Sequence, residues 1–455
     1  MSKVLLVWLV TYFGGLLLAL VHPIYPFLSY LIFYYAPPEK NWWGEHLPNL
    51  RWSLVASVVM LLSVLMKNGS LERLKPTKNP AFAWLLAFGA NIVVVTLWAE
   101  NRARSWYWTV ALLKIIVLYT LMPVVIRTPA QFDMFAAAHI GGATYWGYKA
   151  WDEPKISAGR LKDPGGPDTQ NENAAAAHVL TVLPFVAVYA FSVKRRWLQG
   201  AIVLSGAFIV NMLILCNSRG SIVALLAMVC AAVALVGRGR RLRLVAVGLG
   251  AAAMLFALSN HRFIERQQTT VEAKDGSSQG RLEAWAAGLK FMRDHPLGTG
   301  GRGFHILSAE YIPDIVQDHG GEERSVHDTY LQLAAEWGVQ GLITWGGFIA
   351  TTLLMLRRGR KDTASDANPW FFYRFFAIEL ALIGTLIAGV FTSRLYGESL
   401  YWMCSLAFVM RRLHATAMTE KEPAVVTVPA PTRRLGARIP ATISRTAVVH
   451  RQSSF

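Results

Sequence analysis

The chain has 455 residues, of which 54% are apolar and only 16% are charged, and its mean hydropathy is +0.35. This composition is too apolar for a single soluble domain, and several segments are long enough to cross a bilayer. A formal net charge of +17 is also found in nucleic-acid-binding proteins, but the distribution of the charge along this chain argues against that class.

The apolar segments predict an all-α polytopic membrane protein. Twelve spans are expected near residues 4–21, 51–66, 81–99, 106–126, 132–149, 173–192, 198–216, 220–236, 242–259, 338–356, 370–391 and 397–410. Residues 24–36 are also apolar, but this stretch is short and follows Pro23. It is therefore either an interfacial segment or a thirteenth span.

The spans divide the chain into four parts. Membrane helices are expected over residues 1–259 and 338–412, on either side of a polar segment at 260–337. The polar segment is expected to form one large, partly helical loop that carries the catalytic residues. Residues 413–455 are polar, basic and without clear periodicity, which is typical of a disordered cytoplasmic tail.

Basic residues gather at alternate connections between the predicted spans. The clusters are Lys67, Arg73, Lys75 and Lys78; Arg127; Lys194, Arg195 and Arg196; Arg238, Arg240, Arg241 and Arg243; Arg357, Arg358, Arg360 and Lys361; Arg411 and Arg412. This alternation is typical of cytoplasmic connections in membrane proteins. The polar segment, with eight Lys/Arg against twelve Asp/Glu, falls on the opposite side. We therefore expect it to face the periplasm of a bacterial inner membrane, and we expect no nucleic-acid partner.

The polar segment is the natural place for chemistry in so apolar a chain, since it holds twelve of the 28 acidic residues and five of the 11 histidines. From Arg281 to Arg293, apolar residues recur at helical spacing. The pattern predicts an amphipathic helix at the membrane surface that ends before Pro296. A second helix is expected to begin around Asp328 and to continue into the next span.

Two arginines at the predicted outer face are candidates for binding an anion. Arg219 lies in CNSRGS between two apolar segments, and Arg281 begins the amphipathic helix. A guanidinium group binds phosphate oxygens through two parallel N–H donors and stays charged. The simpler alternatives are an arginine that extends to the lipid headgroups at position 219 and a solvated surface arginine at position 281.

His327 is the candidate general base, because histidine titrates near neutral pH. The alternative is a structural or solvated loop histidine. Asp328, Glu322 or Glu323 would be near enough in sequence to orient its ring. Arg302, Asp328 and Tyr330 complete the predicted substrate-binding set, together with Arg219 and Arg281.

The stretch GTGGRG, from Gly298 to Gly303, contains the spacing GxGxxG. No strand is expected before it, so we predict a flexible turn instead of a dinucleotide site. The alternative is that its N–H groups contact a phosphate. A second alternative is a divalent-metal cluster of His319, Glu322, Glu323, His327 and Asp328. Because the HExxH spacing is missing, we predict no metal site.

Two ionisable residues, Lys114 and Glu379, fall inside predicted spans. Buried charges in a membrane usually pair with one another or line a cavity. A structural pair is the simpler interpretation, but the sequence does not show that these two residues meet.

Four motifs in order resemble the O-antigen ligase and polymerase superfamily of bacterial membrane glycosyltransferases. They are SRG at Ser218, GR…W at Gly280, DHPLGTGGRGF at Asp294 and VHDTYLQLAAEWGVQGL at Val326. The early part of the chain is similar to a subgroup of exosortase-associated O-glycosylation ligases. One departure is Asp328, where the family usually has asparagine.

The resemblance implies transfer of a glycan from a polyprenyl diphosphate carrier to an acceptor hydroxyl of lipid A core, a protein or another glycan, without a cofactor or a metal. Arg219 and Arg281 would bind the diphosphate, and His327 would deprotonate the acceptor. A polymerase of the same superfamily remains the nearest alternative. A transporter or flippase of lipid-linked glycans would need a charged path through the bundle, and a structural membrane protein is a third possibility.

Overall fold

The computed structural model describes residues 2–48, 50–68, 79–163, 165–169, 171–259, 263–264, 276–365 and 369–421. Within these ranges the chain is almost entirely helical, as predicted. The only strands there are β1 (Ile156–Ser157) and β2 (Arg160–Leu161), which form a small antiparallel hairpin. The predicted all-α membrane architecture is therefore confirmed.

The helices follow the predicted spans closely. In chain order they are α1 (Lys3–Leu17), α2 (Ile24–Tyr35), α3 (Trp52–Asn68), α4 (Phe82–Thr96), α5 (Arg102–Val125), α6 (Pro129–Asp152), α7 (Glu172–Ser192), α8 (Arg196–Cys216), α9 (Arg219–Leu235), α10 (Arg238–Leu258), α12 (Gly276–Asp294), α13 (Gly303–Ile306), α14 (Ser308–Tyr311), α15 (Pro313–Asp318), α16 (Thr329–Asp362), α17 (Trp370–Ala388) and α18 (Glu398–Lys421). Three short 3-10 helices are η1 (Leu18–Leu20), η2 (Pro38–Lys40) and η3 (Trp42–Gly44).

Each of the twelve predicted spans falls on one of these helices, but only six helices in the described residues are long and apolar enough to cross a membrane: the continuous stretch Lys3–Leu20, α5, α7, α8, α16 and α17. The number of crossings stays a prediction. Within the stretch 24–36, Ile24–Tyr35 form α2, which at 12 residues is too short for a full crossing and is mostly buried among its neighbours. Helix α18 continues past the predicted boundary at 412 to Lys421, and residues 422–455 of the predicted tail lie outside the described residues.

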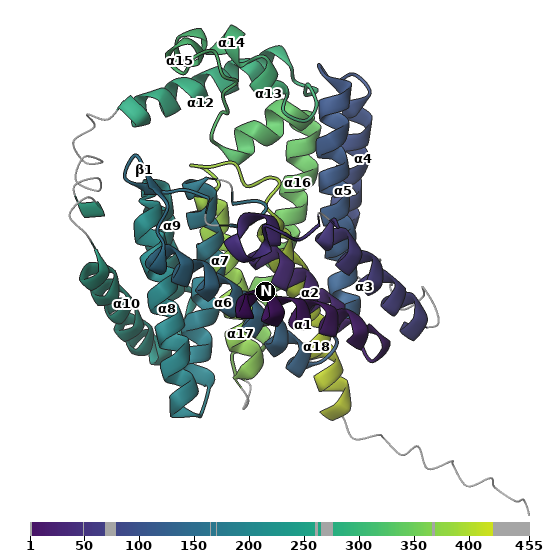
Figure 1. Cartoon of the computed structure of the whole chain (residues 1–455), viewed down its shortest axis with the longest axis vertical. Helices are drawn as coiled ribbons and strands as arrows, with labels where there is room; N and C mark the ends of the chain where they lie inside the picture. The colour runs from purple at the N-terminus through teal and green to yellow at the C-terminus, as the bar shows by residue number, and fades with distance from the viewer. Residues whose placement is uncertain are drawn as a thin grey trace, which may run out of the picture.

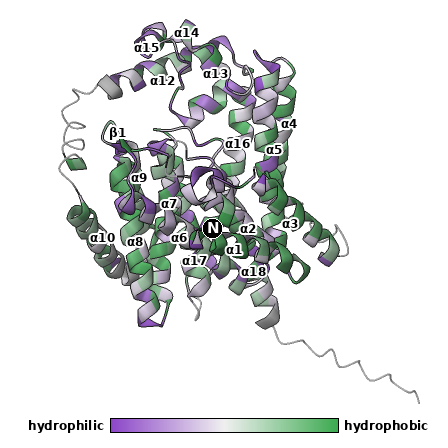
Figure 2. Ribbon diagram, viewed as in Figure 1, coloured by the Kyte–Doolittle hydropathy of each residue, from purple (hydrophilic) through white to green (hydrophobic). Residues whose placement is uncertain are grey.

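The polar helices α12 to α15 gather at one end of the helix bundle (Figure 1). They differ in hydropathy from α3, α4, α8 and α9, which are mostly hydrophobic (Figure 2). The α4–α5 connection meets the same end, because Trp98 Nε1 donates to the Gly298 carbonyl at 3.1 Å. Alternate connections therefore share one end of the bundle, which is the topology that the charge pattern predicts.

The connections that carry the basic clusters contact one another at positions away from the polar helices α12 to α15. Arg412 Nη2 donates to the Ile126 carbonyl at 2.8 Å, next to Arg127. Arg360 Nη1 donates to the Leu235 carbonyl at 2.6 Å, at the end of α9. Two helix ends that carry predicted cytoplasmic charges thus contact helix ends of the same kind. The membrane side of these connections is not part of the structure and stays a prediction.

Glu379 is paired, but its partner is Arg360. Their side chains are joined by an Nε–Oε2 contact of 2.5 Å and are 5% and 7% exposed, whereas Lys114 is exposed. The suggested pair of Lys114 and Glu379 is therefore wrong. The reason is that the C-terminal part of α16 packs against α17 and brings a different cation to Glu379.

We expect Glu379→Gln to lower the melting temperature of the protein in detergent, because the substitution leaves the buried Arg360 charge without its counter-ion. Breaking a typical buried pair lowers the free energy of unfolding by about 3–5 kcal/mol. Glu323→Gln is the matched control. Glu323 pairs with Arg104 at 2.7 Å, but these side chains are 45% and 40% exposed, and such pairs contribute about 0–1 kcal/mol. Equal melting temperatures for the two variants would contradict this prediction.

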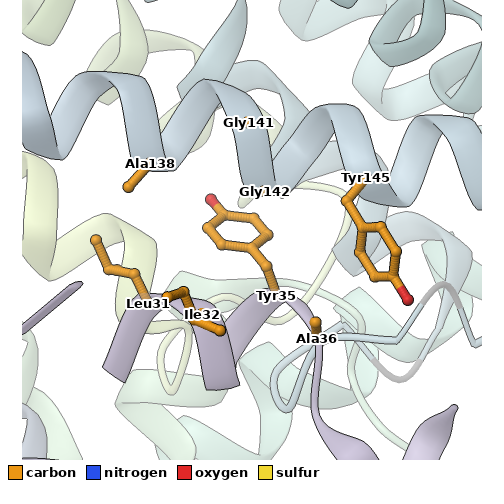
Figure 3. Close-up of a pocket in the computed structure, with 8 residues that line it drawn as sticks. All are labelled: Leu31, Ile32, Tyr35, Ala36, Ala138, Gly141, Gly142 and Tyr145. Carbon is orange, nitrogen blue, oxygen red and sulfur yellow. The ribbon is translucent and has the colours of Figure 1, made fainter. Parts of the chain in front are cut away.

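An apolar groove of about 260 Å³ lies between α2 and α6. Tyr35 projects between the two helices beside Gly142, and Tyr145 stands at one end (Figure 3). A Cβ atom on Gly142 would lie 2.1 Å from the Tyr35 ring, so the close approach of the two helices requires glycine there. The Tyr35 hydroxyl contacts His139 Nδ1 at 2.6 Å and His178 Nε2 at 2.9 Å in the interior of the bundle.

Candidate functional site

His327 lies at the entry to α16 and is held in an unusual backbone conformation. Its φ angle is +53°, and its N–H donates to Ser325 Oγ at 3.0 Å. Such a left-handed conformation is strained for a side chain of this size and persists only where neighbours hold it. Among the described residues, neither ring nitrogen of His327 forms a hydrogen bond within the protein. The imidazole is thus fixed through its backbone, while its nitrogens stay available.

The charge environment keeps His327 neutral. Burial, together with the positive charges of Arg281 and Arg324, lowers the pKa of His327 to about 4. A histidine with this pKa is unprotonated at pH 7 and has a lone pair that can accept a proton. The same interaction places Arg281 close enough to His327 for their charges to interact, although 46 positions separate them in the sequence.

Helix α12 carries Arg281 and packs against the segment that precedes His327. Its apolar face, which includes Ala287 and Phe291, shares a small core with Phe304 and Val326. A Cβ atom on Gly288 would lie 2.8 Å from the Val326 side chain, so the helix approaches this segment closely. The predicted helix is therefore present, but Leu282 and Leu289 of its predicted apolar face are 62% and 54% exposed, and the helix packs through Ala287 and Phe291 instead.

Arg219 is the first residue of α9, at the polar end of the bundle. The chain turns from α8 into α9 through Asn217, whose φ angle is +47°. Ser218 Oγ donates to Asn173 Oδ1 at 2.9 Å, and Arg160 Nη2 donates to the same oxygen at 2.7 Å. The first turn of a helix favours anions, because its N–H groups and dipole are positive there. Arg219 adds a full charge to that end.

The connection between α17 and α18, residues 389–397, contacts the surroundings of Arg219, Arg281 and His327. We call it the α17–α18 loop. A Cβ atom on Gly220, next to Arg219, would lie 2.3 Å from the Phe391 side chain, and the Phe391 ring lies 6.3 Å from that of Trp285, one helical turn after Arg281. Ser393 Oγ lies 3.4 Å from Ser325 Oγ, which holds the His327 N–H. The loop therefore brings Arg219, Arg281 and His327 to one region.

The sequence interpretation missed this loop, because the predicted spans 370–391 and 397–410 left only five residues between them. One signal was present. Arg394 is an arginine at a predicted outer connection, where the distribution of basic residues disfavours it. Arg219, at another predicted outer connection, carries the same signal.

Arg302 and His305 form a contact pair beside the site. The Arg302 guanidinium lies over the Trp108 ring at 4.4 Å, and its Nη1 lies 2.5 Å from His305 Nε2. Because arginine can only donate, His305 Nε2 must accept, so the ring is neutral and carries its proton on Nδ1. Burial and the charges of Arg302, His327 and Arg104 lower the pKa of His305 to about 3, in agreement with a neutral ring.

Asp328 and Tyr330 have structural contacts at the start of α16. Asp328 Oδ1 accepts from the N–H groups of Tyr330 and Leu331, both at 2.7 Å, and so caps the helix. The Tyr330 hydroxyl donates to the Leu386 carbonyl at 2.7 Å. Their roles in binding substrate stay predictions.

The glycine-rich stretch packs as a backbone strap between the α4–α5 connection and α16. Its N–H groups donate inside the protein: Thr299 to the Ala335 carbonyl, Gly300 to the Glu336 carbonyl and Gly301 to Ser105 Oγ, at 3.1, 2.8 and 3.0 Å. These groups are therefore not available to a phosphate. The element directly before the strap is helix α12 and not a strand, so the structure gives a dinucleotide site no support.

Two acidic residues of the polar segment, Glu323 and Asp328, have partners elsewhere in the protein. Both Glu323 carboxylate oxygens accept from Arg104 Nη1, and Asp328 caps α16. Across the described residues no group of three or more His, Cys, Asp or Glu side chains is placed to hold a metal ion. The described structure therefore does not bring His319, Glu322, Glu323, His327 and Asp328 together as one group.

Comparison with known proteins identifies the part of the chain that contains these residues. Residues 204–346 match the family model described as O-Antigen ligase. This range runs from α8 to the first half of α16 and includes Arg219, Arg281, Arg302 and His327. No curated protein matches the chain. The match at residues 204–346 supports the O-antigen ligase/polymerase superfamily for this domain of the chain.

Proposed function

We propose that the chain is a multi-pass inner-membrane glycosyltransferase that moves a glycan from a polyprenyl diphosphate carrier to an acceptor hydroxyl at the periplasmic face. The observation that carries this proposal is the neutral His327 beside the Arg281 charge, at a polar end of an apolar bundle. A lipid-linked donor needs such an interface, since its isoprenoid chain remains in the bilayer while its glycan remains in water.

Arg219 and Arg281 would bind the diphosphate. Departure of the glycan leaves one additional negative charge on the diphosphate oxygen, so fixed guanidinium groups interact more strongly with the leaving group than with the bound donor. Arg219 stands at the positive end of α9, and Arg281 stands on a helix that packs against the His327 segment. Both groups are therefore suited to stabilising the transition state, where the charge develops.

His327 would act as the general base. Its ring nitrogen accepts the proton of the acceptor hydroxyl while the hydroxyl oxygen forms a bond to the anomeric carbon. The bond from that carbon to the diphosphate oxygen breaks, and the electron pair leaves with the polyprenyl diphosphate. The imidazolium ion then releases its proton to solvent. The charge of the bound diphosphate would offset the nearby arginines and so make His327 a stronger base in the complex than in the free protein.

The pH dependence of transfer follows from the position of His327. Its base form is present above its pKa and is lost as the pH falls through it. We expect kcat/KM, which reports the unliganded protein, to fall on the acid side near pH 4, and kcat to fall at a higher pH because the bound diphosphate raises the pKa. Steady-state assays between about pH 3.5 and 8 measure both profiles, because this range includes the pKa values expected for histidine. Identical acidic limbs would contradict this mechanism.

A direct assay tests the function. The purified protein in detergent receives a polyprenyl diphosphate-linked oligosaccharide and separate acceptors (lipid A core, a peptide or a second glycan), and products are identified by mass spectrometry. We expect glycan on an acceptor and released polyprenyl diphosphate. Product that stays on the carrier in longer chains identifies a polymerase. An absence of any glycosidic product with every acceptor would contradict the proposal and favour a flippase.

A further inference from the structure

A buried ion pair anchors the α17–α18 loop. Arg394 is 2% exposed. Its Nη2 lies 3.4 Å from Asp168 Oδ2, and its Nη1 donates to the Asp168 carbonyl at 3.0 Å. The guanidinium group also donates to Ser399 Oγ at 3.2 Å. A Cβ atom on Gly397 would lie 2.5 Å from Nη2, so glycine leaves the space in which the guanidinium group folds back over the loop.

Asp168 belongs to the α6–α7 connection, residues 153–171. Besides Arg394, it accepts from the Tyr34 hydroxyl and, at 2.8 Å, from the Glu398 N–H. Its side chain is 13% exposed. A carboxylate with several donors in a site of low dielectric constant is held in one geometry, and the loss of its charge leaves the partner guanidinium uncompensated. The pair therefore holds three segments together: α2, the α6–α7 connection and the α17–α18 loop.

The other side of the loop holds the start of α16. The Arg394 N–H donates to Thr329 Oγ1 at 2.9 Å, and Thr329 Oγ1 donates to the Thr392 carbonyl at 2.7 Å. The Thr329 N–H donates to the Gly389 carbonyl at 2.7 Å. Thr329 follows His327 by two residues. A single residue, Arg394, thus contacts Asp168 through its side chain and the entry of α16 through its backbone.

We propose that Arg394 and Asp168 are positioning residues, which hold the α17–α18 loop in the place where His327 can deprotonate the acceptor. The inference rests on the proposed function. Neither side chain needs to touch substrate, because the loop transmits their effect through Thr329 and through the contact of Ser393 with Ser325. A displacement of about 1 Å at a reacting group can lower a rate by about 10²-fold, so a loosened loop has a large effect on the chemical step.

Asp168→Asn and Arg394→Lys test the pair, with Asp163→Asn as the matched control. Asp163 lies in the same connection and also forms an ion pair, with Lys40 at 2.7 Å, but its side chain is 51% exposed. We expect kcat to fall about 10- to 100-fold in both test variants while KM for the donor changes less than about threefold, because the diphosphate ligands remain. Asp163→Asn should keep the parent values.

Amide hydrogen exchange gives a readout that does not depend on activity. We expect faster exchange in residues 325–331 and 389–397 of Asp168→Asn, and no change there in Asp163→Asn. Parent kcat together with parent exchange in Asp168→Asn would overturn the inference. The inference would also be overturned if the variant regained the parent kcat in assays well below its melting temperature. That result would show that the substitution lowers the stability of the fold and does not displace the loop in the folded protein. A parent protein without transfer activity refutes the proposed function, while exchange still decides whether the pair holds the loop.

Discussion

His327→Ala is expected to lower the glycan transfer rate by about 10²- to 10⁴-fold, the range that a positioned general base contributes. The substitution removes the group that accepts the hydroxyl proton and leaves the acceptor to ionise unaided. KM for the donor should change little, because the predicted diphosphate ligands lie on α9 and α12. Initial rates with purified protein in detergent measure the effect.

His319→Ala is the matched control. His319 lies in the same polar segment, directly after α15, and is exposed, with Nδ1 at 2.8 Å from the Ile315 carbonyl. It should keep the parent rate. Full activity of His327→Ala would remove His327 from the mechanism, and a loss of equal size in His319→Ala would point to general damage of the segment.

Arg281→Ala is expected to have two effects. Transfer should fall by about 10²- to 10³-fold, the usual loss when one fixed donor to a developing negative charge is removed. In addition, the acidic limb of kcat/KM should move to higher pH, since the Arg281 charge is one cause of the lowered pKa of His327. An arginine whose charge does not act on His327 would not produce the second effect, so the pH profile is the more specific measurement.

Arg293→Ala, at an exposed position on the same helix, provides the control and should alter neither the rate nor the profile. Arg281→Lys should restore the pH profile, because the charge returns, but only part of the rate, because an ammonium group lacks the planar pair of donors. An Arg281→Ala variant with a parental acidic limb would contradict the proposed interaction of Arg281 with His327.

Much of the architecture was predictable from local patterns. The apolar runs predicted a helix at each of the twelve spans, and the spacing of Leu282, Trp285, Leu289 and Met292 predicted α12. The predicted start of α16 near Asp328 was confirmed, because an aspartate before a helical pattern is a common N-cap. These features depend on neighbours within one or two helical turns, so a single sequence contains them.

The partners of polar side chains were not predictable in the same way. Glu379 meets Arg360 instead of Lys114, and the Gly298–Gly303 strap uses its N–H groups inside the protein. The α17–α18 loop is short in sequence, yet it contacts three elements that lie far from it along the chain. Such contacts depend on how helices pack, which no local pattern encodes. Convergence of Arg219, Arg281 and His327 was therefore a hypothesis until the contacts of Phe391 and Ser393 gave it support.

The most direct test of the account is a structure of the protein with a non-hydrolysable polyprenyl diphosphate-glycan analogue, determined in a lipid nanodisc. The account predicts that the diphosphate contacts the guanidinium groups of both Arg219 and Arg281, and that the His327 ring faces the anomeric carbon from the acceptor side. A diphosphate bound away from these groups, or a His327 ring turned from the glycan, would contradict it.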